Sequence, residues 1–164
     1  MTTIYETADI ITPNDTDLVV KRSFKAPRKL VWRAYTEPEL VRRWMGAPGW
    51  SMPLCEMDVR VGGKFRWGWK SDEDGKQMGF YGEYGEVNAP TRLANTEYFD
   101  AGDIGGDMGS GAAIRNDFAE REGITTLTSV IRYKSKAERE AAMSTGMTDG
   151  MELSYKNLDT LLAA

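Results

Sequence analysis

The hydrophobic pattern of this chain changes its period along the sequence, and these changes restrict the fold. Residues 18–24 (LVVKRSF) alternate as a strand does, whereas residues 27–46 carry apolar side chains at helical spacing. Alternation then returns between residues 54 and 133, and residues 148–162 form a terminal amphipathic helical pattern. A run of strands between an early pair of helices and a late long helix predicts an α+β layer, in which an antiparallel sheet has its helices on one face.

Proline, glycine and capping residues indicate where these elements begin and end. Two short helices are expected near Pro27 and Pro38, with Gly46 ending the second. Ser135 and Glu138 have the S-x-x-E spacing of a capping box, which predicts another short helix. Further strands are expected at 54–61, 64–70, 79–87, 92–99, 112–120 and 124–133, and a loop at 101–111.

Length and charge limit the domain organisation and the partners. The chain has 164 residues, so we expect a single domain over 1–164, with a core at about 18–163 and an irregular arm at 1–15. A net charge of −4 without a basic stripe argues against nucleic-acid binding. Because no apolar run could cross a bilayer and the polar N-terminus lacks signal-peptide features, we expect a cytoplasmic protein with no membrane partner.

The absence of histidine is the strongest restriction on chemistry. The chain has no histidine and one cysteine, Cys55. This composition excludes Ser/His/Asp and Cys/His nucleophilic sites, imidazole bases and the usual zinc sites. We therefore assign no catalytic residue, no metal site and no cofactor. Any catalysis would depend on carboxylates, lysine, tyrosine or bound water.

Gly150 lies inside the predicted terminal helix, where glycine is costly. A glycine in a helix interior is about 1 kcal/mol less favourable than alanine, so the missing side chain needs an explanation. Two explanations remain open at the level of the sequence. Gly150 either allows a strand to approach the helix closely or leaves space for a ligand.

Three segments of the chain resemble a known family. They are FKAPRKLVWRAYTEPELVRRWMG, PLCEMDVRVGGKFRW and SKAEREAAMSTGMTDGMELSYKNLDTLL. Together they resemble the activator of heat-shock-protein-90 ATPase-like branch of the START-like, or SRPBCC, superfamily, over roughly residues 18–163. The resemblance implies a helix-grip fold. In that fold a curved antiparallel sheet wraps around a long C-terminal helix, two short helices follow the first strand, and a cavity lies between helix and sheet.

The inward-facing positions of these elements are the candidate cavity residues. They are Trp44, Trp50, Met57, Trp67, Trp69, Tyr81, Glu83, Asn95, Glu97, Met147, Gly150, Met151, Ser154, Tyr155 and Leu158. Each group has a plainer alternative. Trp67 and Trp69 are more typical of a simple core than of a cavity wall, and Trp44 and Trp50 form either a lid or a hydrophobic staple. The polar strand residues form either solvated faces or a polar sub-site that has Arg22 as its counter-charge.

Three classes of function are compatible with these features. The leading hypothesis is a protein that binds a hydrophobic or amphipathic small molecule, because a cavity is implied and no catalytic set is present. The second is a co-chaperone-like interaction domain, with a chaperone or a second copy of the chain as its partner. The third is a cyclase- or hydratase-type enzyme that uses carboxylates or ordered water. The fold alone does not decide among them.

Overall fold

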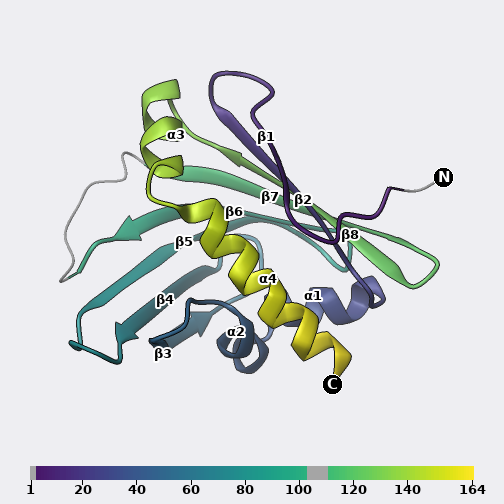
Figure 1. Cartoon of the computed structure of the whole chain (residues 1–164), viewed down its shortest axis with the longest axis horizontal. Coiled ribbons are helices and arrows are strands. Elements are labelled where there is room, and N and C mark those ends of the chain that lie inside the picture. The colour runs from purple at the N-terminus through teal and green to yellow at the C-terminus, as the bar shows by residue number, and fades with distance from the viewer. Residues whose placement is uncertain (1–2, 103–110) are drawn as a thin grey trace.

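The computed structural model describes residues 3–102 and 111–164 and shows an antiparallel sheet crossed by a long helix (Figure 1). Within this part of the chain the sheet has eight strands in the order β1-β2-β8-β7-β6-β5-β4-β3. The strands are β1 (Asp9–Ile11), β2 (Asp17–Phe24), β3 (Trp50–Met57), β4 (Lys64–Ser71), β5 (Gln77–Asn88), β6 (Arg92–Asp100), β7 (Ala112–Arg121) and β8 (Ile124–Arg132). The helices are α1 (Arg28–Thr36), α2 (Pro38–Trp44), α3 (Lys136–Met143) and α4 (Met147–Ala163).

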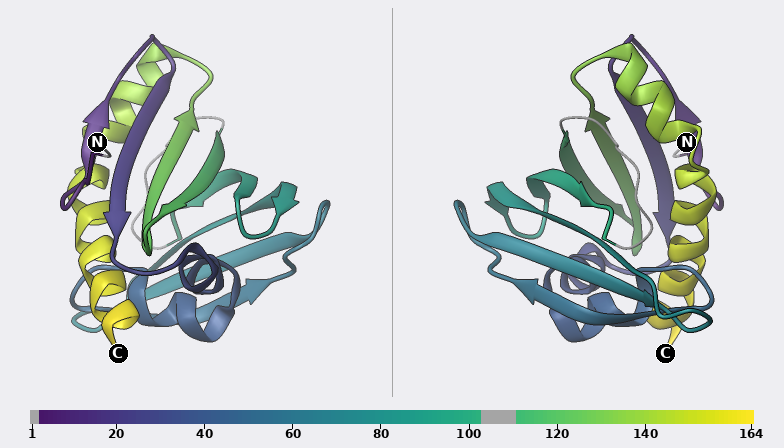
Figure 2. Two further views of the ribbon diagram at one scale, coloured as in Figure 1. Left: turned by 90° about the vertical axis from the view of Figure 1, so that its right-hand side faces the viewer. Right: turned by 90° about the vertical axis from the view of Figure 1, so that its left-hand side faces the viewer.

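The α+β fold expected from the sequence is confirmed. Neighbouring strands pair antiparallel throughout the described sheet. The sheet is curved, and α4 runs diagonally across one face of it with α1 and α2 beside its C-terminal half (Figures 1 and 2). We call the side of the sheet that faces α4 the inner face and the opposite side the outer face.

Local signals placed the helices correctly. α1 begins directly after Pro27, and α2 has Pro38 as its first residue. The Ser135 hydroxyl accepts a hydrogen bond from the Glu138 amide at 3.1 Å, which confirms the predicted cap at the start of α3. α4 begins one residue before the predicted start, after Gly146 in a left-handed conformation. Most of the predicted loop at 101–111 lies outside the described residues.

Two sequence expectations about strands need correction. The N-terminal arm is not wholly irregular, because β1 pairs with Val19–Lys21 of β2. Three residues are too few to produce a recognisable alternation. The strand expected at 54–61 instead runs from Trp50 to Met57, and Val61 beyond it is exposed.

The core fills the space between the inner face and the helices. Leu18, Val20 and Phe24 of β2 are fully buried there, together with Leu158 of α4. The Phe24 and Tyr155 rings pack edge to face, with 5.8 Å between their centroids. The inner residues of β2 therefore fix the terminal helix over the sheet.

An irregularity in β5 changes which of its side chains point inward. Tyr84 pairs with Asn95 and Val87 pairs with Leu93, with a shift of register between Tyr84 and Glu86. The extra residue places both Tyr84 and Val87 on the inner face, although they are three positions apart. Strict alternation, which groups Val87 with Glu83, is wrong at this point.

Candidate functional site

Arg22 positions α4 by binding two of its carboxylates. The guanidinium is 2% exposed, and it lies 3.0 Å from Glu152 and 2.7 Å from Asp159. It also donates to the Ser23 carbonyl at 2.8 Å and lies over the Phe24 ring. Arg22 is therefore committed to the helix, and the hypothesis that it serves as the counter-charge of a polar sub-site is wrong.

The loop after α2 is fixed to α4 and to the sheet. The Gly46 amide donates to the Ser154 hydroxyl at 3.2 Å, and the Asn157 side chain donates to the Trp44 carbonyl at 3.3 Å. Trp69 donates to the Met45 carbonyl at 3.3 Å, directly beneath this loop. These contacts join the C-terminal end of α2 to β4 and to α4.

The tryptophans expected at the cavity differ in their surroundings. Trp44 is buried and donates to the Ala34 carbonyl at 2.8 Å, so it belongs to the core and is not part of a lid. Trp69 is also buried, whereas Trp50 and Trp67 are half-buried. Of these four, Trp67 combines partial exposure with a buried indole nitrogen that has no partner among the described residues.

Two buried side-chain atoms on the inner face lack a hydrogen-bonding partner within the described residues. The Tyr84 hydroxyl and the Trp67 indole nitrogen are buried atoms with no protein partner. Burial raises the pKa of Tyr84 well above its usual range, so the hydroxyl stays protonated. The Phe65 ring lies between these two residues, with its centroid 4.4 Å from Trp67 and 5.4 Å from Tyr84.

Glu97 is a further polar residue of the inner face, and desolvation dominates its electrostatics. It lies two residues from Asn95 on β6, on the same inner face, and pairs with Ala112 of β7. Desolvation raises the pKa of its carboxyl to about 7, although the side chain as a whole is only half-buried. Its charge in turn contributes to raising the pKa of Tyr133, although burial is the larger cause. We call Trp67, Tyr84 and Glu97 the inner polar trio.

The residues of α4 opposite this region are two methionines, which have flexible side chains and are partly exposed. Met147 and Met151 are half-buried against the core, and the Tyr133 hydroxyl donates to the Met147 sulfur at 3.4 Å. A Cβ added at Gly150 would have no neighbour within 4 Å. Gly150 therefore does not serve close packing against a strand, and the position beside it is open.

A pocket of about 720 Å³ lies on the outer face. Its residues come from β2, β5, β6, β7 and β8 and from the turn before β4. They are Asp17, Val19, Val61, Gly62, Glu83, Tyr84, Gly85, Ala94, Asn95, Thr96, Ala113, Ile114, Arg115, Val130 and Arg132. Most of the strand residues among them lie on the face away from α4, whereas Tyr84, Asn95 and Ile114, which also line the pocket, belong to the inner face. The sheet therefore separates most of this outer pocket from α4.

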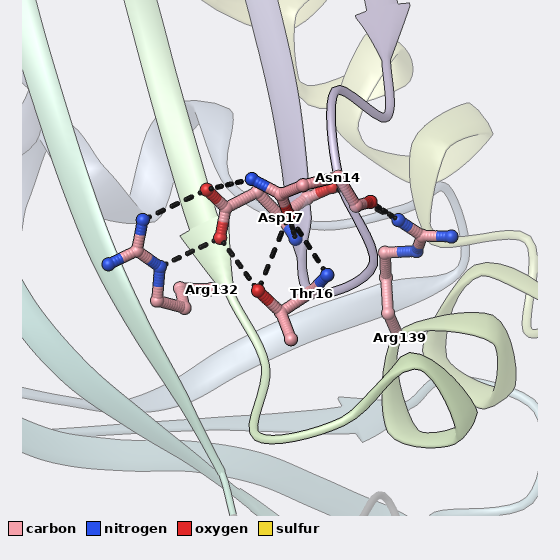
Figure 3. Close-up of polar contacts among 5 residues, drawn as sticks. All are labelled: Asn14, Thr16, Asp17, Arg132 and Arg139. Carbon is pink, nitrogen blue, oxygen red and sulfur yellow. Dashed lines mark hydrogen bonds and ion pairs between the residues drawn. The ribbon is translucent and has the colours of Figure 1, made fainter.

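The charged groups at one end of the outer pocket bind one another (Figure 3). Arg132 contacts both carboxylate oxygens of Asp17, at 2.8 and 3.0 Å, and Asn14 and Thr16 also donate to that carboxylate. The hydrogen bond from Arg132 is the largest cause that lowers the pKa of Asp17 to about 2. Arg139 of α3 donates to the Asn14 carbonyl and so links this network to the helix.

The structure separates the predicted cavity residues into three groups. Trp44, Trp69, Tyr155 and Leu158 are buried in the core. The half-buried residues on the inner face, on α4 or at the start of β3 are Trp50, Met57, Trp67, Asn95, Glu97, Met147, Gly150, Met151 and Ser154. Tyr81 and Glu83 are exposed on the outer face, so these two do not lie between helix and sheet.

Sequence reasoning missed Tyr84 and Tyr133. Tyr84 lies at even spacing from Phe80 on β5, so choosing the face that carries the aromatic residues would have identified it. Tyr133 follows the last residue of β8, and its contact with Met147 joins two elements that no local pattern relates.

The described residues contain neither a cluster of metal ligands nor a membrane-spanning helix. No group of three or more acidic or cysteine side chains is placed to hold a metal ion there, and no helix has the length and hydropathy needed to span a bilayer.

Comparison with solved structures finds close agreement in fold. A protein from Rhodobacter sphaeroides is 28% identical with a TM-score of 0.85, and the alignment covers 95% of this chain and 97% of that one. A protein from Nitrosomonas europaea is 27% identical with a TM-score of 0.79 over 93% and 97%. A protein from Mycobacterium smegmatis, 23% identical with a TM-score of 0.83 over 95% and 96%, shares the fold. No curated protein matches the chain in sequence.

The family comparison agrees with the fold. The description "Activator of Hsp90 ATPase homolog 1-like protein" matches residues 25–163, which include α1, α2, strands β3 to β8, α3 and α4. The matched region contains the inner polar trio and the helix that covers it. The chain therefore belongs to the activator of Hsp90 ATPase homolog 1-like family, within the helix-grip SRPBCC superfamily.

Proposed function

We propose that this protein binds a small hydrophobic or amphipathic molecule between α4 and the inner face of the sheet. Two members of the inner polar trio, Trp67 and Tyr84, carry the proposal, because buried polar atoms without partners cost about 1–3 kcal/mol each. A ligand that hydrogen-bonds to Tyr84 and Trp67 would remove that cost. Aromatic rings and the methionines Met147 and Met151 would surround its apolar part.

The state of Glu97 supports the same location. A carboxyl at the open surface keeps an ordinary pKa, whereas one packed tightly among side chains is fully buried. Glu97 combines a pKa of about 7 with a half-buried side chain. Its neighbours are small: Ala112 lies opposite on β7, and Gly82 on β5 approaches the Thr96 carbonyl so closely that no side chain would fit. These small neighbours, Ala112 and Gly82, support space beside the carboxyl.

The outer pocket is a weaker candidate for the same function. Its main charged groups, Asp17 and Arg132, already bind each other. Within the described residues, the buried side-chain atoms of the sheet that lack a partner are those of Trp67 and Tyr84, which are inner-face residues. The experiment below nevertheless distinguishes the two locations.

Binding is tested by screening hydrophobic and amphipathic metabolites against the purified protein. A ligand is expected to change tryptophan emission saturably and to raise the melting temperature, with about 2.7 kcal/mol of added stability at a hundredfold excess over Kd. Native mass spectrometry should detect the one-to-one complex. A broad screen in which no compound does any of these would refute the proposal.

Two adjacent residues of β7 provide matched variants that locate the ligand. Ala112 faces the inner side, and Ala113 lines the outer pocket. Ala112→Phe should weaken binding on the order of tenfold or more by filling space, and Ala113→Phe should leave Kd unchanged. The reverse result would place the ligand in the outer pocket. Met151→Phe on α4 is a second inner blocking variant if Ala112→Phe does not fold.

An interaction function is the second candidate, and one observation favours it. Tyr81 and Tyr98 are both exposed on the outer face, and their rings stack at 5.4 Å. Exposed aromatic pairs are common at protein interfaces, and the family description refers to activation of Hsp90 ATPase. If this surface binds a chaperone, replacing both tyrosines with serine should abolish the interaction in a pull-down with an Hsp90-type chaperone while preserving the melting temperature. The contacts of the described residues give the cyclase or hydratase alternative no comparable support.

A further inference from the structure

Among the described residues, the inner face has an unpaired acidic group, and no basic group beside it is available. Glu97 makes no ion pair or hydrogen bond within the described residues, and desolvation is the cause of its raised pKa. The buried cation of the inner face, Arg22, is bound by Glu152 and Asp159. Since two carboxylates meet one guanidinium there, that cluster contributes a net negative charge and offers no positive charge to a ligand.

The surfaces around the inner polar trio also favour positive charge. The Phe65 ring contacts the rings of both Trp67 and Tyr84. These three rings form a continuous aromatic wall beside β6, the strand that carries Glu97. The faces of aromatic rings attract cations, and tryptophan does so most strongly. The Trp67 ring is half-buried, so part of it can be reached.

We infer that the ligand of the inner site is an organic cation: an apolar amine or ammonium compound whose positive group lies at Glu97 and whose apolar part lies against Trp67 and the methionines of α4. The inference rests on the proposed binding site and adds the chemical class of its ligand. A cation gains from the carboxylate and from the rings together, whereas an anion would meet an unscreened like charge.

The groups packed around Glu97 leave it as the one that titrates near neutral pH. Ala112 of β7 is uncharged, and the phenols of Tyr84 on β5 and Tyr133 after β8 have their pKa raised by burial. From α4, Met147 reaches this region as the partner of the Tyr133 hydroxyl. Because ionised Glu97 is the form that attracts a cation, affinity for a permanent cation should rise about tenfold from about pH 6 to about pH 8.

The test compares three probes of similar shape on the full-length protein. They are phenylpropyltrimethylammonium, its neutral isostere with carbon in place of nitrogen, and a phenylalkyl carboxylate of the same length. Kd is measured by calorimetry and tryptophan fluorescence at both pH values. The cation should bind about tenfold tighter than the neutral isostere at the higher pH and show the rise in affinity, whereas the carboxylate should bind weakest.

Variants connect the effect to the carboxyl. Glu97→Gln should remove both the preference for the cation and the pH dependence while keeping the affinity for the neutral isostere. Glu83→Gln, which changes a carboxylate on the outer face, should alter neither. An unchanged preference in Glu97→Gln would overturn the inference.

The outcomes separate this inference from the proposed function. If neutral or anionic compounds bind at least as tightly as the cation and Ala112→Phe blocks them, the site exists but the inferred ligand class is wrong. If none of the three probes binds while the wider screen finds a neutral ligand, the ligand class is again wrong. If no compound of any charge binds, both the site and the inferred class are refuted.

Discussion

Arg22→Met is expected to lower the free energy of unfolding by about 3 kcal/mol, because it removes the cation that fixes α4 to β2. Loss of one partner from a buried ion pair costs about 3–5 kcal/mol. The guanidinium is 2% exposed, but the side chains of Glu152 and Asp159 are 19% and 43% exposed. Water can partly hydrate the carboxylates left behind, so the cost should lie at the lower end of that range.

Urea denaturation followed by far-UV circular dichroism measures this cost. With a slope of about 2 kcal/mol per molar urea, the midpoint should fall by about 1.5 M with the slope unchanged. The melting temperature should fall by about 6–12 °C for a chain of this size. Arg33→Met is the matched control, because Arg33 of α1 forms an exposed pair with Glu37, the residue that follows this helix, and it should give no resolvable shift.

A series of variants tests whether the charges themselves are responsible. Asp159→Asn should cost less than Glu152→Gln, because Asp159 is the more exposed partner, and both should cost less than Arg22→Met. Equal midpoints for Arg22→Met and the wild-type protein would refute the reasoning. The conclusion would then be that hydrophobic contact alone holds α4, as in proteins where apolar residues replace a buried ion cluster without loss.

Three further predictions concern individual positions. Hydrogen bonds from Arg132 lower the folded-state pKa of Asp17 to about 2. The stability that ionised Asp17 contributes is therefore complete above about pH 4 and is lost as the pH falls toward 2. In urea midpoints measured across this window, Asp17→Asn should flatten the decline of stability with falling pH. Ser135→Ala should cost about 1 kcal/mol by removing the α3 cap, as measured by the urea midpoint. Gly150→Ala should stabilise the protein by about 0.5–1 kcal/mol in thermal melts, whereas Gly46→Ala should destabilise it. The reason is that Gly46 has a φ of +123° and an added Cβ would lie 2.8 Å from Trp69. The opposite order of the two melting temperatures would contradict the assigned environments.

Much of the fold was predictable because its signals are local. Pro38 and the Ser135 cap mark helix boundaries through backbone chemistry that distant residues do not alter. The inner residues of β2 were also identified, because Leu18, Val20 and Phe24 lie at even spacing along a strand that is paired on both sides. β1 was missed, because its three residues acquire strand geometry only by pairing with β2.

The partners of Arg22 were beyond the reach of sequence reasoning. An arginine on the inner face of a strand indicates a charge that must be paired, but the pattern does not say with what. Glu152 and Asp159 are 130 and 137 positions away along the chain, and they meet Arg22 only after α4 crosses the sheet. Whether Arg22 forms a structural ion pair or binds a ligand therefore depends on how α4 crosses the sheet.

The contrast between β5 and β6 shows which candidate site residues a sequence can place. Asn95 and Glu97 lie on a strand whose register with β7 runs unbroken from Arg92 to Glu97, so alternation from the buried Leu93 places both on the inner face. Glu83 lies on the outer face, on the strand that carries the register shift at Tyr84 and Glu86, and there alternation groups it wrongly with Val87. The high cost of burying an unpartnered polar group points to a ligand site only where the sequence assigns the residue to the correct face of its strand. Continuous pairing supports that assignment for Glu97, the residue on which the inferred ligand class depends.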